Sequence, residues 1–266
     1  MNKSIFDLRS AVALLLSVCV LVGCGGTKVL KESQPIQTTQ PLAAVSDQRV
    51  TATLDWVIVR DGPGTWAKNA DWDEYLLRVN NQSDQQIKVL RLIAVDSLDT
   101  PIVPQPGRKQ LVKGSKKTAR RYKQSGVKVK AGRGTGTMLV AGAAVTVVGM
   151  GAATVVAYGS AMSGATAAGG AGAAAGGLLL LGPALAVGGV VRGVNNSRVN
   201  KQIELRQTVL PLEIQANEEL GLNVFFPLAP SPKRVELIYS DAAGEQSLVI
   251  DTSTALDGLH IGTPAR

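Results

Sequence analysis

The sequence contains very few of the residues that enzymes most often use for chemistry. Its 266 residues include one histidine and two cysteines, and aromatic residues make up only 4%. These counts exclude a framework of several disulfides and a metal cage of histidine and cysteine. Charged residues are also scarce at 18%, whereas glycine occurs 29 times, a balance that is unusual for a soluble enzyme. We therefore expect a non-enzymatic protein without a metal or a dissociable cofactor, in which His260 lies on the surface.

Acidic residues are absent from a long central stretch. Between Asp99 and Glu204 the chain holds fourteen Lys or Arg residues and no Asp or Glu. Ordinary solvated surfaces mix both signs, so this separation indicates a specialised segment. Eleven of the cations lie in a basic segment, residues 107–133, and are Arg108, Lys109, Lys113, Lys116, Lys117, Arg120, Arg121, Lys123, Lys128, Lys130 and Arg133.

The N-terminus has the composition of an export signal. Lys3 and Arg9 precede an apolar run over residues 11–22, which is too short to span a bilayer but suits the core of a signal peptide over residues 1–23. The run ends in a short motif whose last residue is the second cysteine. Its residues are Leu21, Val22, Gly23 and Cys24, and the motif resembles the lipobox of bacterial lipoproteins.

This resemblance implies a lipid anchor. In that family the cysteine, here Cys24, receives a diacylglycerol on its thiol, loses the preceding peptide and is acylated, for example with palmitate, on the new amine. Each buried methylene adds about 0.8 kcal/mol to membrane binding, so several acyl chains anchor firmly. Gly25 follows Cys24, whereas Asp at that position retains enteric members in the inner membrane. The resemblance thus implies a bacterial cell-envelope protein in the outer membrane.

The chain after Cys24 predicts a β domain divided by an insertion. Residues 24–47 are polar and predict a flexible tether. Period-two alternation predicts strands in residues 48–106 and again in 201–253, including one within Gln202–Ile214 that bends at Pro211. Residues 254–266 are predicted to form a C-terminal tail. About seven short strands with regular turns suit an immunoglobulin-like β-sandwich, to which the resemblance is one of pattern only.

The insertion contains 58 uncharged residues, 134–191. This length suits two membrane-spanning helices, near Thr137–Tyr158 and Gly172–Val191, joined as a hairpin whose two ends carry basic flanks. A helix pair buried in an oligomer or lying on the bilayer, and a soluble or disordered Gly/Ala segment, are the alternatives.

Small residues recur at a spacing of four in this insertion. Such residues let helix backbones approach closely in lipid, and the pattern resembles the glycine-zipper segments of bacterial surface lipoproteins. The expected packing positions are Gly149, Ala153, Ala157, Gly169, Ala173 and Gly177. We therefore expect self-association into a homo-oligomer through the hairpin.

The basic segment has three possible roles. It can orient the hairpin and contact anionic lipid head groups, or it can bind an anionic envelope polymer. Nucleic acid is disfavoured as a partner because Tyr122 is the only residue of the segment available for stacking on bases.

The combination of these features favours a structural or interaction role in the envelope. Lipobox, folded domain and Gly-rich insert together make a layout similar to that of the surface-exclusion lipoproteins of the TraT type. A pore-forming or membrane-perturbing protein and an adaptor for anionic polymers are the alternatives. The protein partner is not identified by the sequence.

Overall fold

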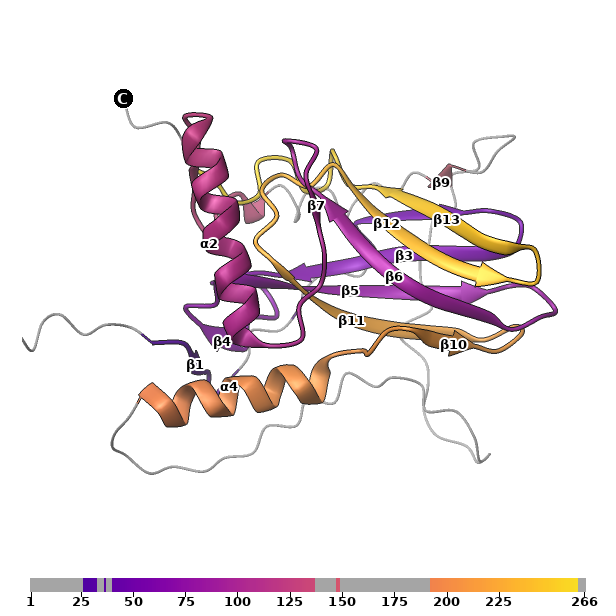
Figure 1. The fold of residues 1–266 in the computed structure, drawn as a ribbon, viewed down its shortest axis with the longest axis horizontal. Helices are drawn as coiled ribbons and strands as arrows, with labels where there is room; N and C mark the ends of the chain where they lie inside the picture. Colours follow the sequence, from indigo (N-terminus) through magenta and orange to yellow (C-terminus); the bar gives the residue numbers. More distant parts are fainter. Residues whose placement is uncertain (1–25, 33–35, 37–39, 137–146, 149–191, 263–266) are drawn as a thin grey trace, which may run out of the picture.

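The protein folds into two antiparallel sheets that enclose one hydrophobic core, with two helices at one end (Figure 1). This computed structural model describes residues 26–32, 36, 40–136, 147–148 and 192–262. The expectation of a mainly β protein is therefore confirmed for this part of the chain.

The first sheet has five strands in the order β11-β5-β3-β2-β9. Its members are β11 (Glu219–Pro227), β5 (Trp72–Asn81), β3 (Val50–Ile58), β2 (Ala43–Ser46) and β9 (Val147–Val148). All neighbours pair antiparallel except β2 and β9, which are parallel. The long strands occupy the positions at which alternation of apolar and polar residues predicted them.

The second sheet has the order β10-β6-β12-β13, with β7 paired to β6. Its members are β10 (Leu212–Ile214), β6 (Ile87–Val95), β12 (Arg234–Asp241), β13 (Gly244–Asp251) and β7 (Pro101–Ile102). Strands before and after the insertion pair directly, since β12 lies against β6 and β11 against β5. The two halves of the sequence therefore contribute strands to the same two sheets.

Two further pairs of short strands lie outside these sheets. They are β1 (Lys28–Val29) with β4 (Ala67–Lys68), and β8 (Lys128–Val129) with β14 (Ile261–Gly262). Three expectations are wrong here. The predicted tether over 24–47 contains β1 and β2, the predicted tail over 254–266 places Ala255, Leu256 and Leu259 in the core, and His260 is fully buried.

The basic segment is part of the folded body. Helix α2 (Arg108–Gln124) begins after Pro106-Gly107 and is followed by Gly126, whose positive φ of 75° suits the left-handed residue that ends a helix. Its inner face buries Leu111, Ser115, Thr118 and Tyr122. Gly114 allows close packing on β11, because a Cβ atom at this position would lie 2.5 Å from Cγ of Pro227.

The second helix limits the extent of the strand predicted within Gln202–Ile214, which does not continue through Pro211. Helix α4 (Arg192–Arg206) includes the first five of these residues, and only Leu212–Ile214 form a strand, β10. Val199 and Ile203, one helical turn apart, are fully buried in the core, so packing of this apolar pair favours the helix.

The predicted hairpin lies almost wholly outside the described residues. The described part of the first predicted helix, Val147–Val148, forms β9. All six predicted packing positions, from Gly149 to Gly177, and the lipobox residues Leu21, Val22, Gly23 and Cys24 are outside the described part. Among the helices that are described, none is both long and apolar enough to cross a membrane.

Candidate functional site

The outward face of α2 carries a continuous row of cations. Of the eleven predicted contact residues, eight lie on α2, and six of these fall within an arc of about 120° when successive residues are placed 100° apart; this arc is opposite the buried face. We call this row the basic stripe; it consists of Lys109, Lys113, Lys116, Lys117, Arg120 and Lys123. All six side chains are exposed, and none forms an ion pair with any residue of the described ranges. A stripe about 20 Å long on a rigid helix therefore presents unneutralised positive charge.

The other predicted contact residues have different surroundings. Arg121 forms an ion pair with Asp96, whose side chain is buried, and Arg108 donates a hydrogen bond to Oγ1 of Thr27 at 3.3 Å. These two arginines fasten the helix to the body. Lys128, Lys130 and Arg133 follow the helix and are also exposed. The structure thus separates the cations that anchor α2 from those that face solvent.

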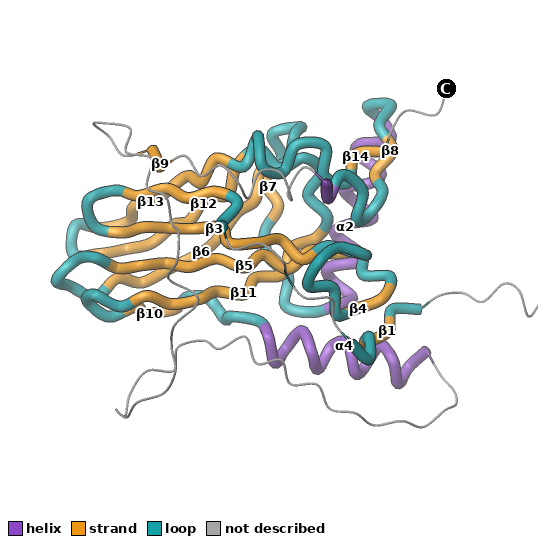
Figure 2. Tube along the Cα trace, turned by 180° about the vertical axis from the view of Figure 1, so that it is seen from behind, coloured by secondary structure: helices purple, strands orange, loops and turns teal. Residues whose placement is uncertain are grey.

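The basic stripe lies at the end of the molecule from which the chain leads back toward Cys24. In Figure 1, β1, β4, α2 and the first turn of α4 all lie at the left, and Figure 2 shows the same grouping from behind. Asn69 donates to the carbonyl of Gly26 at 3.4 Å, and α4 packs against β1. The first described residues after Cys24, the basic helix and the start of α4 therefore lie at one end of the domain.

The start of the insertion is held by His260. The backbone N–H of Gly132 donates to Nδ1 of His260 at 3.1 Å, so the ring proton is on Nε2, which donates to Oδ2 of Asp73 at 2.8 Å. The backbone of His260 also bonds to Lys130 and Arg133. Asp73 and His260 are both fully buried, so this contact is a fixed part of the core rather than a surface contact.

The C-terminal end of α4, the helix that follows the insertion, is held by Glu74, the next residue of β5. Glu74 is buried and accepts hydrogen bonds from Nε1 of Trp66 at 2.6 Å, from Arg206 at 3.2 Å and from Asn223 at 3.3 Å. Burial raises the pKa of Glu74, and the charge of Arg206 opposes this rise. The guanidinium of Arg206, the last residue of α4, also lies over the ring of Trp66 at 5.1 Å.

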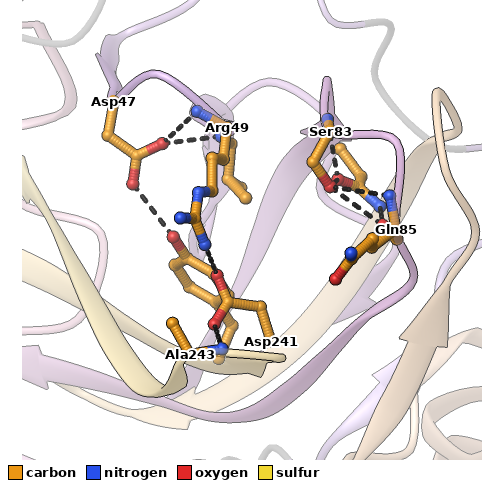
Figure 3. Close-up of polar contacts among 9 residues, drawn as sticks. Asp47, Arg49, Ser83, Gln85, Asp241 and Ala243 are labelled. Carbon is orange, nitrogen blue, oxygen red and sulfur yellow. Dashed lines mark hydrogen bonds and ion pairs between the residues drawn. The ribbon is translucent and has the colours of Figure 1, made fainter.

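The opposite end of the domain is closed by polar contacts among its own turns (Figure 3). Asp47 accepts hydrogen bonds from the backbone N–H groups of Arg49 and Val50 and from the hydroxyl of Tyr239. Arg49 forms an ion pair with Asp241, which also accepts from the N–H of Ala243. These groups satisfy one another, whereas the basic stripe does not have acidic partners in the described chain. The charge asymmetry therefore distinguishes the α2 end.

Sequence reasoning identified the basic residues but not their geometry. It missed Asp73, Glu74 and His260, because their roles depend on pairings across 187 positions and on α4. The adjacent Asp73-Glu74 pair within an apolar strand was the available signal, since buried acids require partners. No group of three or more metal-ligating side chains occurs within the residues the structure describes.

Comparison of this chain with models of protein families, with curated proteins and with solved structures gave no match.

Proposed function

We propose that this protein is a non-enzymatic lipoprotein of the bacterial outer membrane, anchored through lipid on Cys24, that docks on anionic head groups through the basic stripe. The observation that supports this proposal is the set of six exposed, unpaired cations on α2, at the end of the domain where the chain leads to Cys24. Its role is structural or interactive within the envelope.

The electrostatics favour a membrane surface as the partner. Each Lys or Arg near an anionic bilayer contributes about 1 kcal/mol, and the attraction decays within a Debye length of roughly 10 Å at 0.1 M salt. A lipid anchor holds the domain within this range, so weak single contacts act together. The inner face of α2 is fixed by Leu111, Ser115, Thr118 and Tyr122, so the stripe binds without ordering a new helix.

We expect neutralisation of half of the stripe to weaken membrane binding strongly. The triple variant Lys113→Gln, Lys117→Gln and Arg120→Gln should bind anionic vesicles on the order of 100-fold more weakly at 0.1 M salt, since three cations contribute about 3 kcal/mol. The measurement is vesicle co-sedimentation of the full chain carrying Cys24→Ser, so that the lipid anchor does not mask the loss.

A matched control removes the same charge elsewhere. Lys88 and Arg91 lie on β6 and Lys233 lies just before β12, and they pair with Glu213, Glu245 and Asp99. Their replacement by Gln should change vesicle binding by less than about threefold, because these cations are already paired with acidic side chains and do not belong to the basic stripe. Equal weakening by both triple variants would contradict the proposal.

We further propose that the two sheets form an immunoglobulin-like sandwich interrupted by a Gly/Ala-rich helical hairpin over 134–191. Direct pairing of β6 with β12 and of β5 with β11 supports this, because these pairs join the two halves of the chain without a strand of the insertion between them. The hairpin is then free to mediate self-association through Gly149, Ala153, Ala157, Gly169, Ala173 and Gly177.

Replacement of residues 137–191 by a short Gly/Ser linker should leave a folded, lipidated domain of smaller oligomer size. The measurement combines light scattering in detergent with circular dichroism of the β domain. A control variant that scrambles the order of the same residues keeps composition and length. An unfolded β domain, or an unchanged oligomer in the linker variant, would count against the hairpin's role.

The basic stripe also favours a second candidate, an adaptor that binds an anionic polymer of the envelope. Such binding falls with salt as membrane binding does. The two are distinguished by retention of the Cys24→Ser chain on isolated anionic wall polymer compared with vesicles. The pore-forming alternative predicts dye release from vesicles that requires the hairpin.

A further inference from the structure

A polar cleft lies beside the basic stripe. It has a volume of about 560 Å³ and is lined by Gly26, Thr27, Arg60, Asn69, Asp71, Arg108, Val112 and Asn196. Five parts of the chain contribute: the residues after the predicted lipid site, Arg60 after β3, the loop between β4 and β5, the first turns of α2 and the first turns of α4. The cleft is therefore created by tertiary contacts that bring these segments together.

The charges in the cleft favour an anion. Arg60 and Arg108 contribute two guanidinium groups and Asp71 one carboxylate, which pairs with Arg60. Arg60 also donates to the carbonyl of Ala70, and Arg108 donates to Thr27. Each guanidinium has five N–H donors in a planar fork that matches phosphate oxygens, so donors remain for a ligand. The side-chain amides of Asn69 and Asn196 add neutral polar groups at the wall.

The position of the cleft favours a lipid as the source of this anion. Gly26 follows Cys24 by two residues, and a chain spans at most about 3.6 Å per residue. A lipid on Cys24 would therefore place the cleft within roughly 7 Å of its attachment point, at the depth of the phosphates of neighbouring lipids.

We propose that this cleft binds the phosphate group of a phospholipid head group between Arg60 and Arg108. The proposal rests on the proposed function for the location of the lipid, but the cleft residues are distinct from the basic stripe. The stripe supplies diffuse attraction to a surface, whereas the cleft holds one phosphate. Bound phosphate would fix the first turns of α2 and α4 relative to the residues that follow Cys24.

The sharpest variant places a negative charge in the cleft with little change of shape. Asn196→Asp is nearly isosteric, and an acidic residue near the start of a helix is tolerated. Repulsion between the new carboxylate and a phosphate bound in the cleft should weaken phosphate binding about tenfold. Gln124→Glu adds the same charge at the other end of α2, about 24 Å along the helix from Arg108 and beyond a Debye length, so it should change affinity less than about twofold.

The experiment titrates the full-length lipidated protein in uncharged detergent with inorganic phosphate and with dihexanoyl phosphatidylglycerol. Saturable binding of the phospholipid, alone or with inorganic phosphate, that is weakened by Asn196→Asp and not by Gln124→Glu supports the proposal. Binding of inorganic phosphate alone identifies a soluble phosphate as the ligand and overturns it. The proposal is also overturned if binding of the phospholipid does not saturate, or if Asn196→Asp and Gln124→Glu weaken that binding equally.

The test of the cleft can fail or succeed independently of the test of the basic stripe. Asn196→Asp should leave the binding of the Cys24→Ser chain to anionic vesicles within about threefold of the parent, because the six stripe cations remain. Loss of phosphate binding with vesicle binding retained would confirm the cleft as a separate site, whereas loss of vesicle binding in the stripe variant tests the proposed function.

Discussion

Replacing His260 with alanine is expected to lower the free energy of unfolding by about 3–5 kcal/mol. The ring is fully buried, donates to Asp73 and accepts from the backbone of Gly132. Oδ1 of Asp73 already has no hydrogen-bond partner among the described residues. Removal of the ring would therefore leave a buried carboxylate without any side-chain donor, in addition to a cavity. Urea unfolding of the full chain in detergent, followed by fluorescence of its tryptophans, measures the loss.

The local consequence should appear at the start of the insertion. The amide of Gly132 donates to His260, so its hydrogen exchange should become faster in the His260→Ala variant. Asp257→Ala serves as the control, because Asp257 is exposed and lies three residues away; it should change stability by less than about 0.5 kcal/mol. A loss of less than 1 kcal/mol for His260→Ala, or unchanged exchange at Gly132, would contradict this account.

Glu74→Ala is expected to lower the free energy of unfolding by about 2–4 kcal/mol. The variant would leave Nε1 of Trp66 without its acceptor and remove the partner of Arg206. The side chain of Arg206 is 28% exposed and can therefore regain water, so the loss should be smaller than for a wholly buried pair. Glu74→Gln keeps an acceptor for Trp66 and should cost less than about 1.5 kcal/mol.

The pH dependence of stability, compared between the parent protein and Glu74→Gln, separates the effect of the charge of Glu74 from the effect of its shape. Burial raises the pKa of Glu74 above its ordinary value of 4.5. The folded protein then binds a proton more strongly than the unfolded chain, so this group makes unfolding less favourable as the pH falls from neutral toward 4.5. In urea titrations, the free energy of unfolding of the parent minus that of Glu74→Gln should therefore increase as the pH falls from neutral toward 4.5. A constant or falling difference would contradict the raised pKa.

Asp73 and Glu74 matter together because they are consecutive on β5. Neighbouring side chains of a strand point to opposite faces, so Asp73 reaches His260, which contacts the chain just before the insertion, while Glu74 reaches Arg206 at the C-terminal end of α4. The start of one strand thereby contacts the chain on both sides of a 58-residue uncharged segment, through His260 just before it and through Arg206 fifteen residues after it.

The long strands were predictable because their residues alternate between a buried and an exposed face. β3 and β6 both lie within residues 48–106, where the alternation predicted strands. Trp56, Trp66 and Trp72 lie in the core, as large apolar side chains in such strands usually do. The helix over Arg192–Arg206 was missed since its core contact depends on only two fully buried residues, Val199 and Ile203, amid polar neighbours.

The sequence by itself determined the separation of charge, the apolar N-terminal run before Cys24 and the alternation that builds two sheets, because these depend only on neighbours along the chain. Tertiary structure alone decided that six cations form one outward stripe, that Arg60 and Arg108 share a cleft, and that His260 is buried. The physical reason is that burial and charge pairing are set by distances between atoms, and residues such as Asp73 and His260 meet only when the sheets close around their core.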